Sequence, residues 1–287
     1  MTGTEIKRIA VFTSGGDAPG MNACIRAVVR TAIFRDLEVY GITYGYDGMI
    51  NGNIKRMQSH SVSNIIQRGG TILKSARSEE FRTKEGRAKA YQQLKANGIE
   101  GLVAIGGDGT FTGAKIFFEE YGIPVIGCPG TIDNDIYGTD YTIGFDTAVN
   151  IAVEAIDRLH TTAESHHRAL IVEVMGRHAG WIALHSGIAG DAACILVPEV
   201  KFSVDKVCEF VNSRFKTGTA PIIVIAEGAI PQDGDMITKD GELDAFGHVK
   251  LSGIGEWLAK QIEAKTGKEA RTSVLGHIQR GGTPTAF

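Results

Sequence analysis

Three observations predict an α/β fold with two doubly wound, Rossmann-like lobes and largely parallel sheets. Short apolar runs alternate with helix-like segments along the whole chain, which is the element order of doubly wound domains. Most of these runs are continuously apolar, as expected of parallel strands covered on both faces. A chain of 287 residues is long enough for one large or two medium domains with real cores.

Each element is predicted from its own run of residues. The expected strands, in chain order, are Arg8–Thr13, Glu38–Thr43, Gly101–Ile105, Pro124–Cys128, Ala169–Val174, Ala193–Val197, Pro221–Ala226 and Thr272–Leu275. The expected helices between them are Ala23–Phe34, Thr83–Asn97, Thr110–Tyr121, Thr147–Ala163, Val204–Phe215 and Ile254–Thr266. The helix near Thr147 is where we expect the chain to enter its second lobe. The polar, turn-rich segment Pro231–Gly253 predicts a surface hairpin or loop.

Composition narrows the class of protein. Apolar residues make up 43% and charged residues 22%, which is ordinary for a soluble globular protein. A net charge of −3 without a Lys/Arg run argues against a nucleic-acid binder. The four cysteines are far apart and form no CxxC pair, which favours reduced thiols in a cytosol over disulfides or zinc. We find no signal-peptide pattern and no apolar run of transmembrane length, so we expect a cytoplasmic protein that binds no membrane.

The stretch TSGGDAPGMN (Thr13–Asn22) follows the first expected strand and leads into a helix. Gly15 and Gly20 are five residues apart, as the two glycines of a P-loop are. Met21 and Asn22, however, stand where that loop carries Lys and Ser or Thr. The spacing predicts an anion-binding turn whose positive charge comes from elsewhere.

A second glycine-rich turn, GGDGTFTG (Gly106–Gly113), follows the strand GLVAI and opens a helix. Glycines at such a turn let phosphate oxygens approach backbone N–H groups at the helix N-terminus. Asp108 in an anion loop indicates a cation between carboxylate and phosphate, and Mg²⁺ fits because it binds a few carboxylates plus substrate phosphates. Tight helix–strand packing with a solvated Asp108 is the alternative.

The third turn, PGTIDND (Pro129–Asp135), places Asp133 and Asp135 at the same expected sheet edge. One carboxylate could act as a general base while the other assists the metal. A plain Asx-turn is the alternative. Several basic side chains that suit phosphate groups also stand near strand ends or in loops, and we expect them to converge on one sheet edge: Arg77, Arg168, Arg177, Arg271, His277 and Arg280.

These motifs together resemble the bacterial ATP-dependent 6-phosphofructokinases of phosphofructokinase family A. GGDAPGMN, GGDGT, PGTIDND, VEVMGRHAGW (Val172–Trp181) and GHIQRGGTP (Gly276–Pro284) occur in the family's order from Arg8 to Phe287. GGDGT is shared with NAD kinases and lipid kinases, whereas PGTIDND, MGR and HIQRGG are specific. The longer Pro231–Gly253 segment resembles an actinobacterial-type subgroup. Family members continue beyond HIQRGGTPTAF, so the chain is expected to lack the family's C-terminal end.

The resemblance implies transfer of the γ-phosphoryl group of ATP to the 1-hydroxyl of fructose 6-phosphate, with Mg²⁺ near Asp108. By match to the family's motifs, the residues expected at the nucleotide are Gly16, Tyr46, Arg77, Gly107, Asp108, Gly109, Thr110 and Gly113. The expected catalytic residues are Thr131, Asp133 as base, Asp135 and Arg177. The residues expected at the sugar phosphate are Thr131, Asp133, Arg168, Met175, Gly176, Arg177, Glu227, Arg271, His277 and Arg280.

The resemblance also implies an assembly. Arg168 and Arg271 are expected to reach the sugar phosphate from a neighbouring subunit, which predicts a homotetramer with shared sites. The nucleotide-binding lobe is expected at residues 1–143 and 279–287, the fructose-6-phosphate lobe at residues 144–278, and the active site in the cleft between the lobes. An effector site would use Arg26, Arg30 and Lys216. Its other positions have lost the expected charges, since Asn53 and His160 replace arginines, Gly218 and Ala220 replace basic residues, and Ala193 replaces a carboxylate.

Other functions are weighed against this one. Pyrophosphate-dependent members of the family carry Asp where Gly109 stands and Lys where Gly130 stands, so the two glycines favour ATP. An NAD kinase is favoured by GGDGT alone. A Rossmann dehydrogenase would need G-x-G-x-x-G and an acid closing the second strand, which Glu38 instead begins. A non-catalytic nucleotide or sugar-phosphate sensor would be expected to lose Asp108 or Asp133, and both are present.

Overall fold

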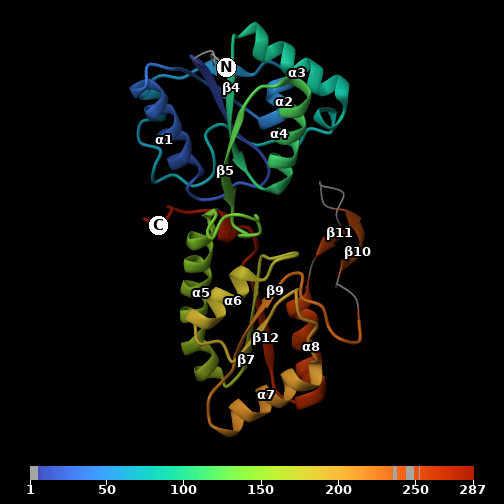
Figure 1. Ribbon diagram of the computed structural model, residues 1–287. Helices are drawn as coiled ribbons and strands as arrows, with labels where there is room; N and C mark the ends of the chain where they lie inside the picture. Colours follow the sequence, from blue (N-terminus) through green and yellow to red (C-terminus); the bar gives the residue numbers. More distant parts are fainter. Residues whose placement is uncertain (1–5, 235–237, 244–248, 252) are drawn as a thin grey trace. The chain divides into compact units, whose positions relative to one another are not determined.

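The computed structural model describes residues 6–234, 238–243, 249–251 and 253–287. Backbone contacts divide the chain into two compact units (Figure 1). Unit 1 is Met1–Asp146 with Arg280–Phe287, and unit 2 is Thr147–Gln279. Unit 2 is therefore one continuous piece of chain inserted into the sequence of unit 1.

Unit 1 contains a six-stranded sheet in the order β3-β2-β1-β4-β5-β6, parallel except for β3. Its strands are β1 (Arg8–Thr13), β2 (Glu38–Ile42), β3 (Ile54–Arg56), β4 (Gly101–Gly106), β5 (Val125–Thr131) and β6 (Ile143–Gly144). Its helices are α1 (Met21–Phe34), α2 (Gly45–Ile50), α3 (Lys84–Ala96) and α4 (Asp108–Tyr121), with 3₁₀ turns at Ser59–Val62 and Glu80–Arg82. The parallel order brings the carboxyl ends of β1, β4 and β5 next to one another.

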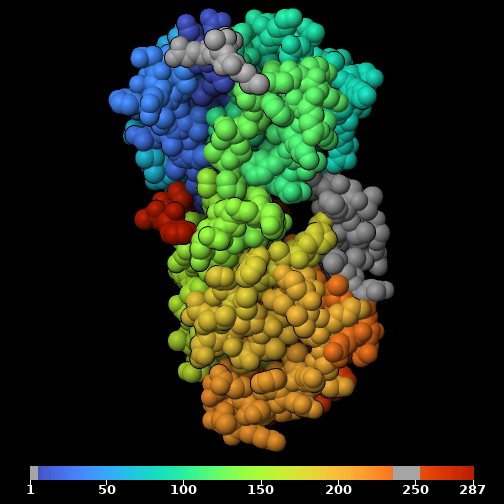
Figure 2. Space-filling view, viewed as in Figure 1, coloured from blue at the N-terminus to red at the C-terminus, as the bar shows by residue number. Residues whose placement is uncertain are grey.

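The apolar runs that predicted the strands form the core of unit 1. Ala10, Val11 and Phe12 of β1 are fully buried. One cluster packs β1, β2 and β4 against α2, α3 and α4, and the outer surfaces of the α3 and α4 segments are cyan and green in Figure 2. Within it the Tyr46 ring lies 4.9 Å from that of Phe12 and 3.9 Å from that of Phe81, measured between ring centroids. This packing fixes the position of α4, whose first turn carries the GGDGT motif.

An ion pair whose arginine is buried joins α3 to α4. The Arg87 guanidinium donates two hydrogen bonds to the Glu120 carboxylate, both 2.7 Å long, and others to the carbonyl oxygens of Phe81 and Arg82. Arg87 thereby holds the pKa of the Glu120 carboxyl below its usual range. Because the Arg87 side chain is only 9% exposed, each of its donors needs such a partner.

Unit 2 contains a four-stranded parallel sheet in the order β12-β7-β9-β8. Its strands are β7 (Ala169–Val174), β8 (Cys194–Leu196), β9 (Ile222–Ala226) and β12 (Ala270–Val274). Its helices are α5 (Phe145–His166), α6 (Trp181–Ala189), α7 (Val204–Lys216) and α8 (Ile254–Thr266), followed by a 3₁₀ turn at Gly276–Arg280. β7 and β9 are buried along their whole lengths, and Figure 1 shows α6 and α8 on opposite sides of the sheet.

The predicted α/β class, parallel sheets and principal elements are confirmed. The prediction that a strand ends at Cys128 is wrong, because β5 pairs with β4 and β6 as far as Thr131. Helices α2 and α6 were not predicted. The expected hairpin or loop at Pro231–Gly253 contains the antiparallel strands β10 (Thr238–Leu243) and β11 (Val249–Leu251); its residues 235–237, 244–248 and 252 lie outside the described residues.

Candidate active site

The turn between β1 and α1 has the backbone of an anion-binding loop. Gly15 and Gly20 adopt left-handed φ angles of 85° and 108°, which glycine tolerates without strain. Helix α1 begins directly afterwards at Met21, and no side chain caps its first turn. The Met21 N–H donates to the Ala18 carbonyl oxygen at 3.2 Å, whereas the N–H groups of the next two residues have no helical partner, and the helix dipole favours an anion there.

Arg280 brings positive charge to this turn. Its Nη1 donates to the Asp17 carbonyl oxygen at 3.0 Å, and a Cβ on Gly16 would lie only 2.7 Å from the same nitrogen. Glycine at position 16 is thus what allows the guanidinium to lie against the loop. Arg280 was predicted at the sugar phosphate, and its contact with the turn between β1 and α1 was not predicted.

Asn22, which stands in place of the P-loop Ser or Thr, has a structural task. Its buried side-chain amide donates to the carbonyl oxygens of Arg68 and Gly69 at 3.0 and 3.1 Å and accepts from the Ile72 N–H at 2.7 Å. Met21 is also buried and does not present a polar group to a ligand. Asn22 therefore fastens the chain around Gly69 to the start of α1.

The segment Arg68–Arg77 is fastened at further points along its length. The Thr13 hydroxyl contacts the Thr71 hydroxyl at 2.9 Å and donates to the Lys74 carbonyl oxygen at 2.7 Å. The Ser75 hydroxyl donates to the Gly15 carbonyl oxygen. These bonds hold the segment along the turn between β1 and α1. The last of them is two residues before Arg77, which was predicted at the nucleotide and belongs to this unit.

The GGDGT turn follows β4 and begins α4. Gly106 has no room for a side chain, since a Cβ there would lie 2.5 Å from Thr110 Oγ1 and 2.6 Å from the Ser14 carbonyl oxygen. Gly107 precedes the first helical residue, Asp108, so the carboxylate of Asp108 lies in the first turn of α4. Asp108 and Gly109 are exposed, and a Cβ on Gly109 would meet nothing within 4 Å.

Tyr46 supports this turn from beneath. Its hydroxyl donates to the Thr110 carbonyl oxygen at 2.6 Å, and its ring lies against Gly113, where a Cβ would be 3.2 Å from the ring. Tyr46 is 7% exposed, and burial raises its pKa well above the usual value. The side chain expected to flank the nucleotide is thus a core residue that shapes the loop.

The loop after β5 is braced by hydrogen bonds between its two ends. The Thr131 hydroxyl accepts from the Asp133 N–H at 3.2 Å, and the Thr142 hydroxyl donates to the Thr131 carbonyl oxygen at 2.6 Å. Asn134, with a φ of 53°, accepts from the Thr142 N–H and donates to the Asp140 carbonyl oxygen. Asp133 is partly buried, whereas Asp135 is exposed.

The sheet order brings these three turns together. β1 and β5 lie on either side of β4, so Gly16, Asp108 and Asp133 all follow the carboxyl ends of adjacent parallel strands. Among the described residues, no group of three or more His, Cys, Asp or Glu side chains could hold a metal. An exposed carboxylate beside two anion loops fits Mg²⁺ held chiefly by substrate phosphates.

Unit 2 carries a second set of predicted residues at the carboxyl edge of its own sheet. Met175–Arg177 follow β7, Glu227 follows β9, and His277 lies in the 3₁₀ turn after β12. Backbone hydrogen bonds tie these segments together, from the Glu227 N–H to the Val174 carbonyl oxygen and from the Leu275 N–H to that of Glu173. The three strands are neighbours, so the side chains follow adjacent strand ends.

Comparison with known proteins decides the family. The family model described as Phosphofructokinase matches residues 8–287 of the chain. This chain belongs to the phosphofructokinase family. The pyrophosphate–fructose 6-phosphate 1-phosphotransferase of Streptomyces coelicolor is 56% identical over 98% of this chain and 82% of its own length. The ATP-dependent 6-phosphofructokinase 1 of Thermus thermophilus is 57% identical over 98% of this chain and 81% of its own length.

Solved phosphofructokinase structures share the fold. The Saccharomyces cerevisiae enzyme superimposes with a TM-score of 0.87 at 36% identity, and the Pichia pastoris enzyme, described in its T-state, with 0.83 at 38%. The matches cover 98% and 99% of this chain, which in turn spans 39% and 31% of those two longer chains. No helix in the described part of this phosphofructokinase is long and apolar enough to cross a membrane.

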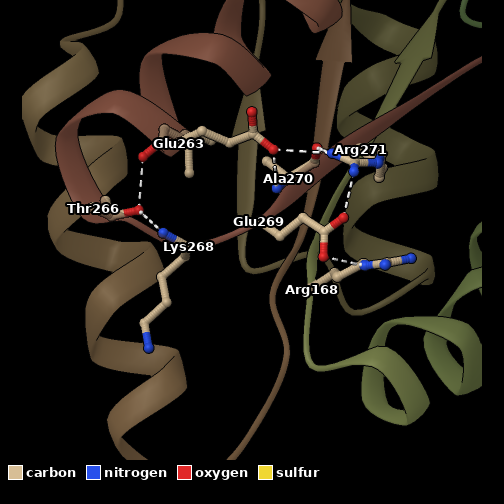
Figure 3. Close-up of polar contacts among 8 residues, drawn as sticks. Arg168, Glu263, Thr266, Lys268, Glu269, Ala270 and Arg271 are labelled. Carbon is tan, nitrogen blue, oxygen red and sulfur yellow. Dashed lines mark hydrogen bonds and ion pairs between the residues drawn. The ribbon is translucent and has the colours of Figure 1, made fainter.

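Two arginines do not lie where the convergence of basic residues predicted. Arg168 immediately precedes β7 and Arg271 is the second residue of β12, so both lie at the amino edge of the sheet. The prediction that all the basic residues share one sheet edge is wrong for this pair. Residues that precede parallel strands lie at the amino edge of the sheet, whereas residues that follow the strands lie at the carboxyl edge. In Figure 3 they form ion pairs with Glu269, at 2.6 Å for Arg168.

The predicted effector residues fall in both units of this phosphofructokinase. Arg26 and Arg30 lie one turn apart on α1 and are partly buried, while Lys216 is the exposed last residue of α7. His160, which stands in place of a family arginine, has its Nε2 2.8 Å from the Gly190 carbonyl oxygen.

Sequence reasoning missed the side chains that hold the loops in place. Asn22, Thr13 and Ser75 are polar residues whose importance lies in bonds to chain 46 to 61 residues away. The sequence shows that Asn22 is a polar residue next to apolar positions at the start of a helix. That pattern alone does not identify its hydrogen-bond partners.

Proposed function

We propose that this phosphofructokinase transfers the γ-phosphoryl group of ATP to the 1-hydroxyl of fructose 6-phosphate, giving fructose 1,6-bisphosphate and ADP. One observation carries the proposal: two glycine-rich anion loops and the Asp133 loop follow three adjacent strand ends. Phosphoryl transfer needs chiefly positioning and electrostatic stabilisation, and these loops supply both. The family assignment and the Thermus thermophilus relative support the same reaction.

Unit 1 supplies the groups that bind the donor. The backbone around Gly16 and the start of α4, at Gly107–Gly109, offer N–H donors to the phosphates, while Arg77 and Arg280 add positive charge. Mg²⁺, when bound near Asp108, would neutralise charge on the phosphate oxygens. Gly113 and Tyr46 contribute by fixing the shape of the loop.

Asp133 acts as the general base toward the sugar hydroxyl. Its loop is held by the Thr131–Thr142 and Asn134–Thr142 hydrogen bonds, which fix the carboxylate relative to the end of β5. Thr131 and Asp135 assist from the same loop, and Arg177 from unit 2 stabilises the charge on the transferring phosphoryl group.

Unit 2 supplies the side chains that recognise the sugar phosphate. Met175, Gly176 and Glu227 bind the sugar, and His277 binds the 6-phosphate together with Arg280. Arg168 and Arg271 lie at the other edge of the unit 2 sheet from Glu227, which supports their acting on a neighbouring subunit's substrate. The active form is then a homotetramer or at least a dimer.

A subunit-mixing experiment tests the shared site. Arg271→Ala and Asp133→Asn chains, each inactive alone, are mixed so that hybrid oligomers form. Hybrids regain some sites that contain both native residues, so activity returns. Absence of recovery in oligomers shown by mass to be mixed contradicts a shared site.

The donor is the point on which relatives differ, because those from Streptomyces and Amycolatopsis carry pyrophosphate names. Gly109 favours ATP: its Cβ position is open, and an Asp there would lie within the anion loop and repel the inner phosphate of the nucleotide. Gly130 is less open, since a Cβ would lie 3.0 Å from Ile105 and 3.1 Å from Met21. A lysine there needs its neighbours to shift.

A coupled assay of fructose 1,6-bisphosphate formation, run with ATP and with pyrophosphate, tests the proposal. We expect a higher kcat/KM with ATP. A higher value with pyrophosphate establishes the second candidate, a pyrophosphate-dependent phosphofructokinase. Binding of ATP and fructose 6-phosphate without product from either donor favours a sensor.

Effector control by ADP or phosphoenolpyruvate is expected to be weak. Arg26, Arg30 and Lys216 remain, but each missing charge-assisted bond to a phosphate weakens binding by roughly 1.5–3 kcal/mol, so two losses imply about a hundredfold or more. Titration of each effector at subsaturating fructose 6-phosphate checks this. A strong micromolar response shows that the site survives its substitutions.

A further inference from the structure

The amino edge of the unit 2 sheet carries a cluster of two arginines and two glutamates, which we call the amino-edge cluster: Arg168, Glu263, Glu269 and Arg271 (Figure 3). Strand register brings the arginines together, because Ala169 of β7 lies opposite Ala270 of β12. Glu263 reaches the cluster from α8. The cluster is partly exposed, with side-chain exposures of 34% for Arg168 and 56% for Arg271.

Glu269 lies between the two guanidinium groups. Its Oε2 accepts from Arg168 Nε at 2.6 Å, and its Oε1 accepts from Arg271 Nη2. The two arginines hold the pKa of the Glu269 carboxyl below its usual range, with Arg168 making the larger contribution, so the group is ionised at neutral pH. Two like charges brought together by the strands would repel one another, and this carboxylate offsets that repulsion.

The bonds are distributed differently over the two arginines. Arg271 Nη1 donates to Glu263 Oε1 at 2.9 Å and to the Ala270 carbonyl oxygen at 2.8 Å, so both its terminal nitrogens are engaged. Arg168 is held only through Nε, and within the described part of the chain its two terminal nitrogens make no hydrogen bond. Those two nitrogens form the planar fork that binds a phosphate bidentately.

We propose that Glu269 is a positioning residue that fixes Arg168 by its Nε, and so presents the Arg168 fork, beside Arg271, to the 6-phosphate of the sugar substrate. This inference rests on the proposed function, in which Arg168 and Arg271 bind that phosphate. Glu269 holds the one guanidinium nitrogen that the fork does not use, so it orients Arg168 without occupying the phosphate position.

The test compares Glu269→Gln with the unmodified enzyme in steady-state kinetics. Loss of one charge-assisted bond at a partly exposed site predicts a rise in KM for fructose 6-phosphate of about 10-fold. The kcat value and the KM for ATP change less than about 2-fold. Fructose, which has no 6-phosphate, keeps its kcat/KM. An unchanged or lowered KM for fructose 6-phosphate overturns the proposal, a lowered one showing that the carboxylate competes with the phosphate.

A double-mutant cycle separates positioning from general stabilisation. If Glu269 acts through Arg168, Glu269→Gln has little further effect in an Arg168→Ala background; an equal effect there overturns the proposal. Glu269→Asp keeps the charge on a shorter side chain and is expected to raise KM as well. Glu154→Gln, which removes an exposed α5 ion pair with Arg158, is the matched control and leaves KM unchanged.

Binding of fructose 6-phosphate measured by calorimetry without a donor keeps the two proposals distinguishable. The affinity loss in Glu269→Gln is then observed whatever the donor or the reaction. A native enzyme that binds the sugar phosphate but makes no bisphosphate contradicts the proposed function alone. Equal affinity of native and Glu269→Gln proteins contradicts the role of Glu269 alone.

Discussion

The carboxyl edges of the two sheets carry different kinds of groups. In unit 1 the ends of β1 and β4 lead into glycine-rich turns. Gly15 has a left-handed backbone that disfavours a side chain, and Gly16 and Gly106 have no room for one, so these turns present mainly backbone groups. In unit 2 the corresponding strand ends lead to side chains, among them Arg177, Glu227 and His277.

The difference teaches what each edge can discriminate. Backbone donors respond to the charge and position of a phosphate and carry little information about the rest of the molecule. Relatives at 56% and 57% identity accordingly carry pyrophosphate and ATP names on the same scaffold. Side chains on a rigid edge can distinguish sugar hydroxyls and a terminal phosphate. Under the proposed function, in which unit 1 binds the donor and unit 2 the acceptor, we expect few substitutions to change the donor and more to be needed to change the acceptor.

The substitution with the largest expected effect tests whether the general base lies at the carboxyl edge of the unit 1 sheet. Asp133→Asn keeps the shape of the side chain but removes its basicity, and general-base catalysis contributes about 10²–10⁴-fold. We expect kcat to fall by that order, with the KM for fructose 6-phosphate changed much less. Steady-state kinetics measure both. A near-normal kcat shows that Asp133 is not the base.

The next effect tests whether backbone recognition depends on buried side chains beneath it. Asn22→Ala removes three hydrogen bonds and leaves the partners around Gly69 and Ile72 unsatisfied. We expect the free energy of unfolding to fall by about 3 kcal/mol and the KM for ATP to rise. Denaturant unfolding and kinetics check the two. Asn22→Asp keeps an acceptor for the Ile72 N–H but loses both donated hydrogen bonds. We expect this variant to be no more stable than Asn22→Ala.

A third change asks whether the α3–α4 ion pair supports unit 1 without touching its edge. Arg87→Met is expected to lower the free energy of unfolding by about 2 kcal/mol at neutral pH, because Glu120 and two carbonyl oxygens lose a buried partner. The pKa of Glu120 is lowered in the folded protein, so its contribution is present above its unfolded pKa and is lost as the pH falls through the folded value. The stability difference between the two proteins should narrow at acidic pH, leaving the part due to the carbonyl oxygens, and parallel curves contradict the assignment.

The smallest effect concerns unit 2. Glu173 is 4% exposed and accepts from the Gly255 N–H at 2.9 Å, and burial raises its pKa. An acid with a raised folded pKa loses stability as the pH rises from its unfolded value through its folded value. Glu173→Gln keeps the acceptor without a charge, so we expect it to be more stable than the native protein above that window by up to about 1 kcal/mol. Unfolding curves across pH 4–8 measure the difference, and a pH-independent difference contradicts the argument.

The strands could be predicted because each needs only a short apolar run bounded by turn residues. Helix α2 could not, since it contains Gly45 and Gly48, and a Cβ at Gly48 would lie 1.6 Å from the Thr43 carbonyl oxygen. Close packing requires these glycines, but glycine has a low helix propensity, so the sequence argues against a helix here. Helix α6 is apolar almost throughout and short, so it has little of the periodicity that marks a helix.

The parts of the candidate site that could be predicted are those whose residues all lie within one short sequence motif. The loops after β1, β4 and β5 carry their own glycines and aspartates. The contact between Arg280 and Asp17, and the bonds of Asn22 to the chain around Gly69, depend on partners distant in sequence, which spacing within a motif does not provide. The edge predicted for Arg168 and Arg271 was wrong, because both residues lie at the amino ends of parallel strands, opposite the edge where the other predicted residues follow the strands.

The insertion of unit 2 within unit 1 sets an order on folding during synthesis. Residues 280–287 return the chain to unit 1, through the bond from Arg280 to Asp17 and that from Thr285 to Asp146. These partners leave the ribosome long after the first strand, whereas unit 2 is continuous and is fully synthesised first. The bond from Arg280 to Asp17 can therefore form only after the whole of unit 2 has been synthesised, although the turn between β1 and α1 is among the first parts of the chain to be made.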